Sequence, residues 1–100
     1  RRLHAAGVLL EQGLAKDALE IAAEAICGEL ADRAGVEPPE RAENATVWLC
    51  TDVLPRLDSG FDSNLATRLV AVSNSPEVPS ALAGELLEDA ETILEALSRC

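Results

Sequence analysis

The stretch SALAGELLEDAETILEALSR, residues 80–99, decides the fold of this chain. Its apolar residues recur at helical steps of three and four and therefore share one face: Leu82, Leu86, Ala90, Ile93 and Leu97, widened by Ala83, Leu87 and Leu94. The opposite side carries Glu85, Glu88, Glu91 and Glu95. We expect Ser80 to cap this helix and Arg99 to lie near its negative end. The pattern predicts a long amphipathic helix that must bury one face against other elements.

Two more helices are predicted in the N-terminal third of the chain. In the first, residues recur at helical steps on one side, namely Leu3, Gly7, Leu10 and Leu14. Gly13 lies where this helix should end. The second helix has Asp17 in its first turn and should end at Gly35, and its apolar stripe comprises Ala18, Ala22, Ala25, Ile26 and Leu30. On its other side we expect Lys16, Glu20 and Glu24 to point to water.

A loop and two shorter helices are predicted in the middle of the chain. Residues 36–40 cannot continue a helix, because two successive prolines lack the N–H that a helix must donate. A helix over about 41–54 follows, in which Trp48 should anchor the core and whose apolar residues are Val47, Trp48, Leu49, Val53 and Leu54. A shorter helix then begins, with Asp62 or Ser63 as its cap.

These segments predict an all-α fold, because none of them shows the period-two alternation of a strand. We expect a compact up-and-down bundle of about five helices: two long N-terminal, two shorter middle and one long C-terminal. A chain of 100 residues supports one modest core, so residues 1–100 should form a single domain. Because the sequence contains no Met, we expect it to be the C-terminal fragment of a longer protein.

The charge balance restricts the partners of this domain. Eighteen Asp and Glu residues against eight Lys and Arg residues give a formal charge of −10. Such a field repels phosphate, so direct binding to nucleic acid or to an anionic membrane surface is not expected. The chain also lacks a signal-peptide pattern and a long apolar run, which favours a cytoplasmic location and no membrane partner.

The sequence offers few groups for catalysis or cofactor binding. The only histidine, His4, is expected to face solvent, and the three cysteines, Cys27, Cys50 and Cys100, show no metal-binding or disulfide pattern. Cys27 and Cys50 fall on apolar faces, where burial should make their thiols inert. The sequence therefore predicts no catalytic residue, no metal and no cofactor. Gly7 and Gly28 lie inside predicted helices, and a close helix crossing would explain them.

Residues 5–19, AAGVLLEQGLAKDAL, continuing through Ala22, Ala25 and Leu30, resemble the opening helix pair of HEPN domains. The closing run Ala81–Leu97, with LLEDAE at its centre, is similar to the final helix of that family. Together these segments cover just under half of the chain. The resemblance implies a helical domain that either cleaves RNA or docks beside another protein.

Catalytic members of that family use an Arg-x4–6-His pair assembled across a dimer. Downstream of Arg68 the matching window holds Ser73, Asn74 and Ser75, and His4 follows its two preceding arginines too closely. The resemblance therefore implies the non-catalytic branch, whose members dimerise or dock beside a nucleotidyltransferase, helicase or other partner. A weaker resemblance, to a tetratricopeptide hairpin, rests on Gly13, Ala18 and Ala25, but that pattern is lost one period of about 34 residues later.

The favoured function is a non-catalytic interaction or dimerisation module of a larger cytosolic protein. Its partner, a second copy or another protein, should contact apolar helix faces, for which the candidate residues are Leu3, Leu10, Leu14, Leu87 and Leu94. Two alternatives remain. One is a HEPN-type ribonuclease or toxin–antitoxin component that depends on His4 or Arg68, and the other is an acidic surface that binds a basic protein.

Overall fold

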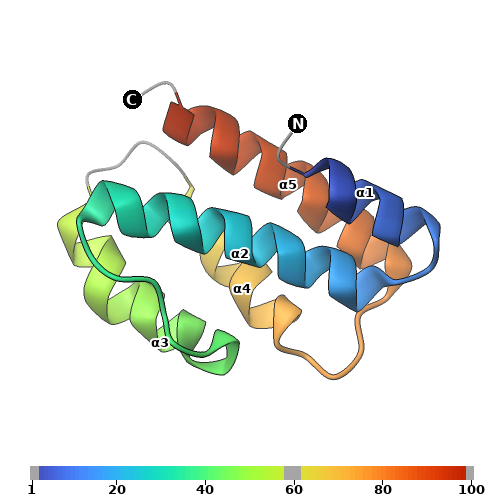
Figure 1. Cartoon of the computed structure of the whole chain (residues 1–100), viewed down its shortest axis with the longest axis horizontal. Helices are drawn as coiled ribbons and strands as arrows, with labels where there is room; N and C mark the ends of the chain where they lie inside the picture. The colour runs from blue at the N-terminus through green and yellow to red at the C-terminus, as the bar shows by residue number, and fades with distance from the viewer. Residues whose placement is uncertain (1–2, 58–61, 99–100) are drawn as a thin grey trace.

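Five α-helices build the part of the fold that the structure describes, and shorter helical turns flank the third of them (Figure 1). The computed structural model describes residues 3–57 and 62–98. The α-helices are α1 (His4–Glu11), α2 (Ala15–Ala34), α3 (Ala45–Trp48), α4 (Ser63–Ser73) and α5 (Ser80–Ser98). No strand occurs within the described residues, which confirms the all-α bundle.

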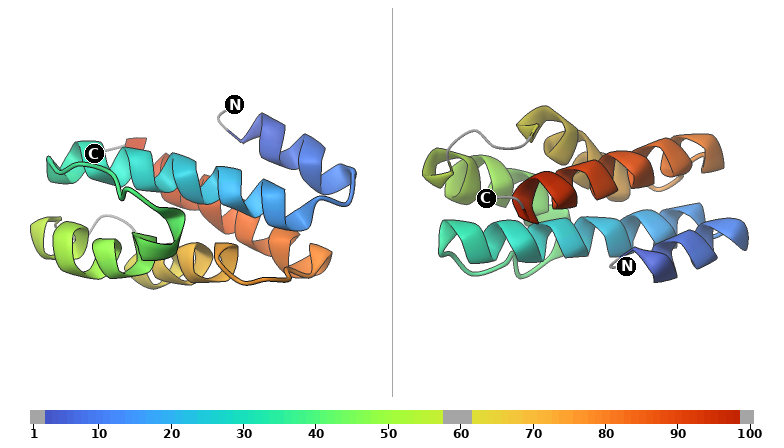
Figure 2. Two further views of the ribbon diagram at one scale, coloured as in Figure 1. Left: turned by 60° about the horizontal axis from the view of Figure 1, so that its bottom comes forward. Right: turned by 90° about the horizontal axis from the view of Figure 1, so that it is seen from above.

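The two long helices, α2 and α5, pack on each other and form the centre of the bundle. The short α1 lies against both of them, while α4 packs beneath them on the other side (Figure 2). Helices α1 and α2 are antiparallel neighbours joined by a turn, and α4 and α5 form a second antiparallel pair (Figure 1). The loop after α2 instead runs back along α2, so the α3 region follows the same direction as α2.

Local sequence explains where α2 and α4 stop and start. Gly35 ends α2 with a left-handed φ of 69°, and the N–H of Val36 donates to the carbonyl of Ala31 at 3.0 Å, as in a Schellman motif. The carboxylate of Asp62 caps α4 by accepting from the N–H groups of Asn64 and Leu65 at 3.0 and 3.1 Å. Asp62, rather than Ser63, is therefore the cap.

The start of α5 differs from the prediction by one residue. The N–H of Ala83 donates to the carbonyl of Pro79 at 2.9 Å, so Pro79 holds the cap position and Ser80 is the first helical residue. The expected cap at Ser80 is wrong for this reason. Arg99 lies outside the described residues.

The helix expected over 41–54 is divided into four short pieces. A 3₁₀ turn, η1 (Ala42–Asn44), leads into α3; a π-helical turn, η2 (Leu49–Val53), follows, and a second 3₁₀ turn, η3 (Leu54–Arg56), contains Pro55. The N–H of Leu54 donates to the carbonyl of Leu49, five residues back. Proline has no N–H and its ring crowds the preceding turn, so regular α-helical bonding cannot continue there.

The core is aliphatic and draws on all the longer helices. Its fully buried large side chains are Leu19, Ile26, Leu30, Leu49, Val53, Leu69, Val70, Leu86 and Ile93. Trp48 is buried as expected, and its indole N–H donates to the carbonyl of Glu37 at 2.8 Å. Val47, assigned to the same apolar side, is instead 66% exposed, because the short α3 turns this side chain away from the bundle.

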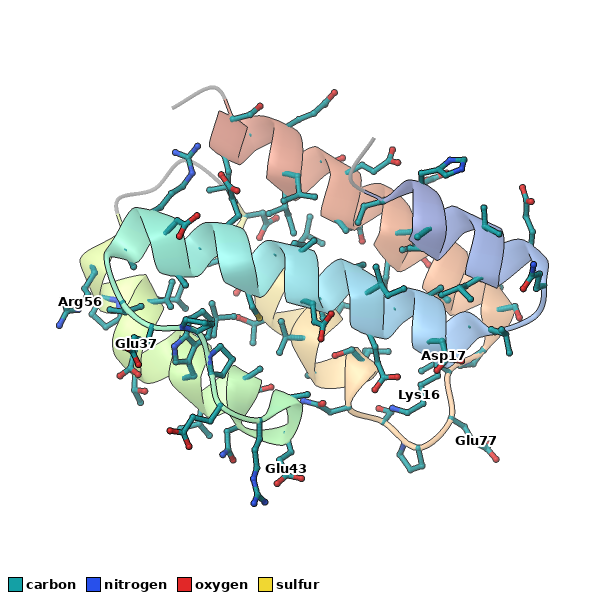
Figure 3. The ribbon with its side chains drawn as sticks, in the orientation of Figure 1. Lys16, Asp17, Glu37, Glu43, Arg56 and Glu77 are labelled. Atoms are coloured by element: carbon teal, nitrogen blue, oxygen red, sulfur yellow. The ribbon has the colours of Figure 1, made fainter. Side chains whose placement is uncertain are left out.

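Lys16 does not point freely to water as predicted. Its ammonium group donates to the carbonyls of Ser73 and Ser75, both at 2.9 Å, across the end of α4. Figure 3 shows Lys16 reaching from the start of α2 toward the loop that carries Glu77. The last carbonyls of a helix lack partners within the helix and carry partial negative charge, which attracts a cation. This side chain therefore ties α2 to the end of α4.

Close helix crossings do not explain Gly7 and Gly28. A Cβ atom placed on either glycine would meet no heavy atom within 4 Å outside its own helix. Neither residue has the left-handed φ found at Gly13 and Gly35. The expectation of a close crossing at these two positions is therefore wrong.

Replacing Lys16 with Met should lower the free energy of unfolding by about 1 kcal/mol, because two backbone carbonyls lose a charged donor while the apolar stem is kept. Urea denaturation monitored by circular dichroism would measure the change. Arg68→Met removes an exposed cation from α4 and serves as the matched control. Equal effects of the two substitutions would contradict the bridging role of Lys16.

Gly7→Ala and Gly28→Ala should each raise the free energy of unfolding by roughly 0.5–1 kcal/mol, because alanine restricts the unfolded chain and fits both sites. Gly35→Ala should have the opposite effect, since alanine is strained at a φ of 69°. Thermal unfolding of the three variants tests this contrast. A loss of stability in Gly7→Ala would show that the helix surface there is more crowded than described.

Candidate functional site

The five leucines proposed as an interaction surface occupy different environments. Leu3, Leu87 and Leu94 are buried in the core cluster, and Leu10 is partly buried against it, with its Cδ2 atom 3.7 Å from the Cβ position of Gly84. Leu14 is 43% exposed. The structure therefore does not place the five in one exposed strip, but two of them border an open groove.

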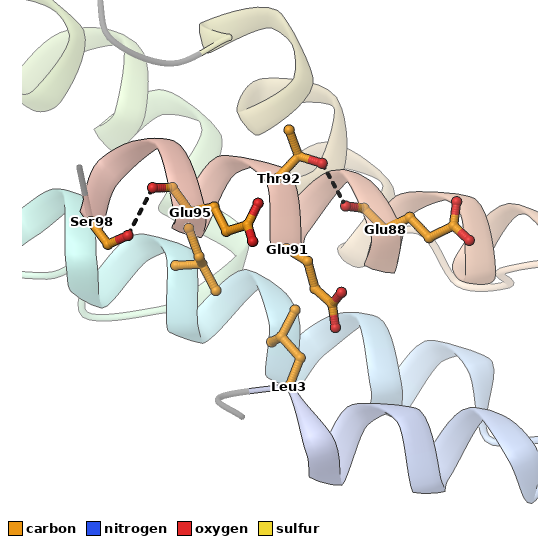
Figure 4. Close-up of a pocket in the computed structure, with 7 residues that line it drawn as sticks. Leu3, Glu88, Glu91, Thr92, Glu95 and Ser98 are labelled. Carbon is orange, nitrogen blue, oxygen red and sulfur yellow. Dashed lines mark hydrogen bonds between the residues drawn. The ribbon is translucent and has the colours of Figure 1, made fainter. Parts of the chain in front are cut away.

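The groove lies between the start of α1 and the C-terminal half of α5, and we call it the α1–α5 groove (Figure 4). Its volume is about 520 Å³ and it opens to solvent. The lining residues are Leu3, Glu88, Glu91, Thr92, Leu94, Glu95 and Ser98. All of them except Leu3 come from α5, so a single helix supplies one complete wall.

The groove exists because α1 is much shorter than α5. Helix α1 has 8 residues and α5 has 19, and the two run antiparallel, with Leu10 near Gly84 (Figures 1 and 2). Helix α1 therefore lies beside the first half of α5 and leaves the second half of this side uncovered by it. Leu3, which directly precedes α1, marks the point where this cover stops. The groove continues from there along the line of α1.

Carboxylates dominate the polar character of the groove. Glu88 and Glu95 are exposed, and Glu91 is partly buried. The two hydroxyl groups are engaged with their own helix, because Thr92 donates to the carbonyl of Glu88 at 3.1 Å and Ser98 to that of Glu95 at 2.8 Å (Figure 4). No basic side chain lines the groove among the residues that the structure describes. The three carboxylates therefore make the described lining of the groove acidic.

Sequence reasoning assigned these carboxylates to a solvated face and missed the groove. The available signal was the contrast between a first helix that ends at Gly13 and a last helix of five turns. A short helix packed against a long one leaves part of the long one without a neighbour. The sequence predicted buried leucines on α5, which agrees with the structure. It did not indicate where along α5 the contact with α1 ends.

The groups considered for catalysis are dispersed. His4 is exposed on α1 and Arg68 is exposed on α4, so they come from different helices. Within residues 3–57 and 62–98, no group of three or more metal-ligating side chains is placed to hold an ion. None of the helices in these same ranges has the length and apolar character required to cross a membrane.

The cysteines differ sharply from one another. Cys27 is buried, and burial, reinforced by the negative charge of Glu24, raises the pKa of its thiol from 9.0 to about 11. Cys50 is exposed, contrary to the prediction of burial, because it shares the outward side with Val47 and Thr51, whereas Leu49 and Val53 enter the core. Cys100 lies outside the described residues.

In comparisons with known proteins, no family model, curated protein or solved structure matches this chain.

Iodoacetamide at pH 8 should modify Cys50 far faster than Cys27. The raised pKa alone lowers the thiolate fraction of Cys27 by about 100-fold relative to an unshifted thiol, and burial slows access further. Peptide mass spectrometry at successive times would give both rates. The rate at Cys27 should rise as the pH approaches 11, and similar rates at pH 8 would contradict the burial of this thiol.

Proposed function

We propose that this chain is a non-catalytic, HEPN-like interaction module that binds a basic amphipathic helix of a partner protein in the α1–α5 groove. The observation that supports this function is the combination of apolar edges at Leu3 and Leu94 with the exposed carboxylates of Glu88 and Glu95. An amphipathic helix with Lys or Arg beside its apolar stripe presents the complementary surface.

The position of the groove favours a helical partner. Helix α1 already packs antiparallel to α5, and the groove extends along the same line. A second helix placed end to end with α1 would meet α5 in the geometry that α1 uses. The buried leucines offer only their edges, so the apolar contact is modest and the charged rim should contribute much of the specificity.

The charge of the chain bears on whether the partner is another copy. Each copy carries a formal charge of −10, so two α1–α5 grooves facing each other would bring like charges together. A basic partner relieves this repulsion, whereas a homodimer through the groove increases it. A homodimer through other apolar residues remains the alternative within the same proposal, and light scattering at high protein concentration distinguishes the two.

The larger context of the proposal follows from the resemblance to HEPN domains. Non-catalytic domains of that kind accompany a nucleotidyltransferase, helicase or other partner in the cytosol. The ribonuclease alternative depends on His4 or Arg68, and it predicts RNA cleavage that disappears in His4→Ala or Arg68→Ala. Binding without cleavage is the outcome that the proposed function requires.

A helical peptide with Leu along one face and Lys along the opposite face should bind the domain. The same peptide with Glu in place of Lys should not bind. Affinity should fall several-fold between about 50 mM and 300 mM salt, because exposed charges are screened over roughly 8–10 Å near physiological ionic strength. The double variant Glu88→Gln/Glu95→Gln should weaken binding by about 3- to 10-fold. Fluorescence anisotropy of the labelled peptide would measure all of these affinities.

The matched control is Glu11→Gln/Glu77→Gln, which removes two exposed carboxylates that do not line the groove. Binding of this variant should stay within about 2-fold of the original, allowing for the smaller net charge. An equal loss in both double variants would mean that the peptide responds to the overall charge and not to the groove. Failure of the Lys peptide to bind at all would reject the groove as the docking site.

A further inference from the structure

A second hollow, separate from the α1–α5 groove, lies where α2 faces the returning loop and α4. We call it the α2–loop pocket, and its volume is about 400 Å³. Its apolar walls come from three parts of the chain: Ala23 and Cys27 on α2, Pro38 and Pro39 in the loop, and Ala45 and Val70 on α3 and α4. The volume lies within the range of small-molecule sites.

The walls of this pocket are held in place by specific bonds. The indole N–H of Trp48 donates to the carbonyl of Glu37 at 2.8 Å, which fixes the loop just before the two prolines. The side-chain amide of Asn74 donates to the carbonyl of Ala42 at 2.9 Å and joins the far end of the loop to α4. Since proline also restricts its own backbone, the loop wall is formed before any ligand arrives.

The side chains that line the pocket are small where they face one another. Ala23, Ala45 and Val70 form a floor that is nearly closed to solvent, while Trp48, the one Trp, Tyr or Phe within residues 3–57 and 62–98, packs in the core and bonds to the loop. Ser73 donates its hydroxyl to the carbonyl of Val70 at 2.7 Å and is thereby satisfied within α4. The apolar walls thus have room for a body of aliphatic or aromatic carbon.

Carboxylates supply the charged groups of the pocket. Glu20, Glu24 and Glu40 all line it, and no basic residue does so within the described ranges. Glu20 already has a cation nearby, because the Lys16 ammonium lies 3.9 Å from its carboxylate. Glu24 and Glu40 are exposed at the surface and provide negative charge next to the apolar walls.

We propose that the α2–loop pocket binds a small organic cation, an ammonium group carried on an apolar alkyl or aryl body. The body would lie between Pro38 and Pro39, above the floor formed by Ala23, Ala45 and Val70, and the ammonium group would meet the carboxylates of Glu24 and Glu40. Anionic ligands are disfavoured by the same carboxylates. The pocket shares no lining residue with the α1–α5 groove, so this inference stands independently of the partner proposed there.

Benzylammonium chloride is a suitable probe, with benzyl alcohol as its uncharged counterpart. Titration of the domain should shift the methyl NMR signals of Ala23, Ala45 and Val70, with half-saturation on the order of 1–10 mM for a ligand this small. Benzyl alcohol should bind more weakly. The signal of Val8, which lies on α1 and does not line the pocket, should not move and serves as an internal control.

Glu24→Gln should weaken benzylammonium binding by roughly 2- to 5-fold and leave benzyl alcohol unaffected. Because Glu24 is exposed, this variant should fold normally, and Glu77→Gln is the matched control outside the pocket. Ala23→Leu should fill the pocket and abolish the shifts, with the remaining NMR spectrum reporting whether the fold is kept. Equal affinity for the amine and the alcohol, or shifts spread over all methyl signals, would overturn the proposal.

Discussion

Burial of the apolar face of α5 against α2 is the interaction on which the rest of the structure depends. These two helices are the longest in the chain, and together they supply most of the fully buried side chains, including Ile26, Leu30, Leu86 and Ile93. Alanines such as Ala18, Ala22 and Ala90 are buried between the larger residues. A domain of this size has a total stability of roughly 5–15 kcal/mol, so truncating one such leucine, at about 2–5 kcal/mol, removes a large share of it.

The shorter elements are positioned by polar bonds to the backbone as well as by apolar contact. Lys16 holds the end of α4, the Trp48 indole holds the loop, and Asn74 joins that loop to α4. The carbonyls of Ser73, Ser75 and Glu37 accept from side chains distant in sequence, and the carbonyl of Ala42 accepts from Asn74 as well as from the N–H of Ala45. Helices of eight to eleven residues are marginal by themselves. These bonds therefore fix the loop and the α4 end, and with them the walls of the α2–loop pocket.

The folded structure determines where the negatively charged side chains lie on the surface. Carboxylates flank both hollows, the α1–α5 groove and the α2–loop pocket, and apolar surface lies beside them in each case. A uniform acidic surface would attract cations without selectivity. Apolar walls next to carboxylates instead suit ligands that combine a cation with a hydrophobic body, which is the shared basis of the two binding proposals.

The sequence by itself determined the long helices, the end of α2 at Gly35 and most of the core, because helical spacing and glycine act over a few residues. Residues 80–99, Gly35 and Trp48 illustrate this. The sequence did not reveal the interrupted helix over 41–54. Only the tertiary structure decided the environments of Lys16, Val47 and Cys50, because the partners of Lys16 and the side of the α3 region that meets the core depend on elements distant in sequence. The two hollows were also decided only by the tertiary structure. The α1–α5 groove arises because α1 is shorter than α5, and the α2–loop pocket arises because the loop after α2 runs back along that helix. A local sequence pattern cannot place these elements relative to one another.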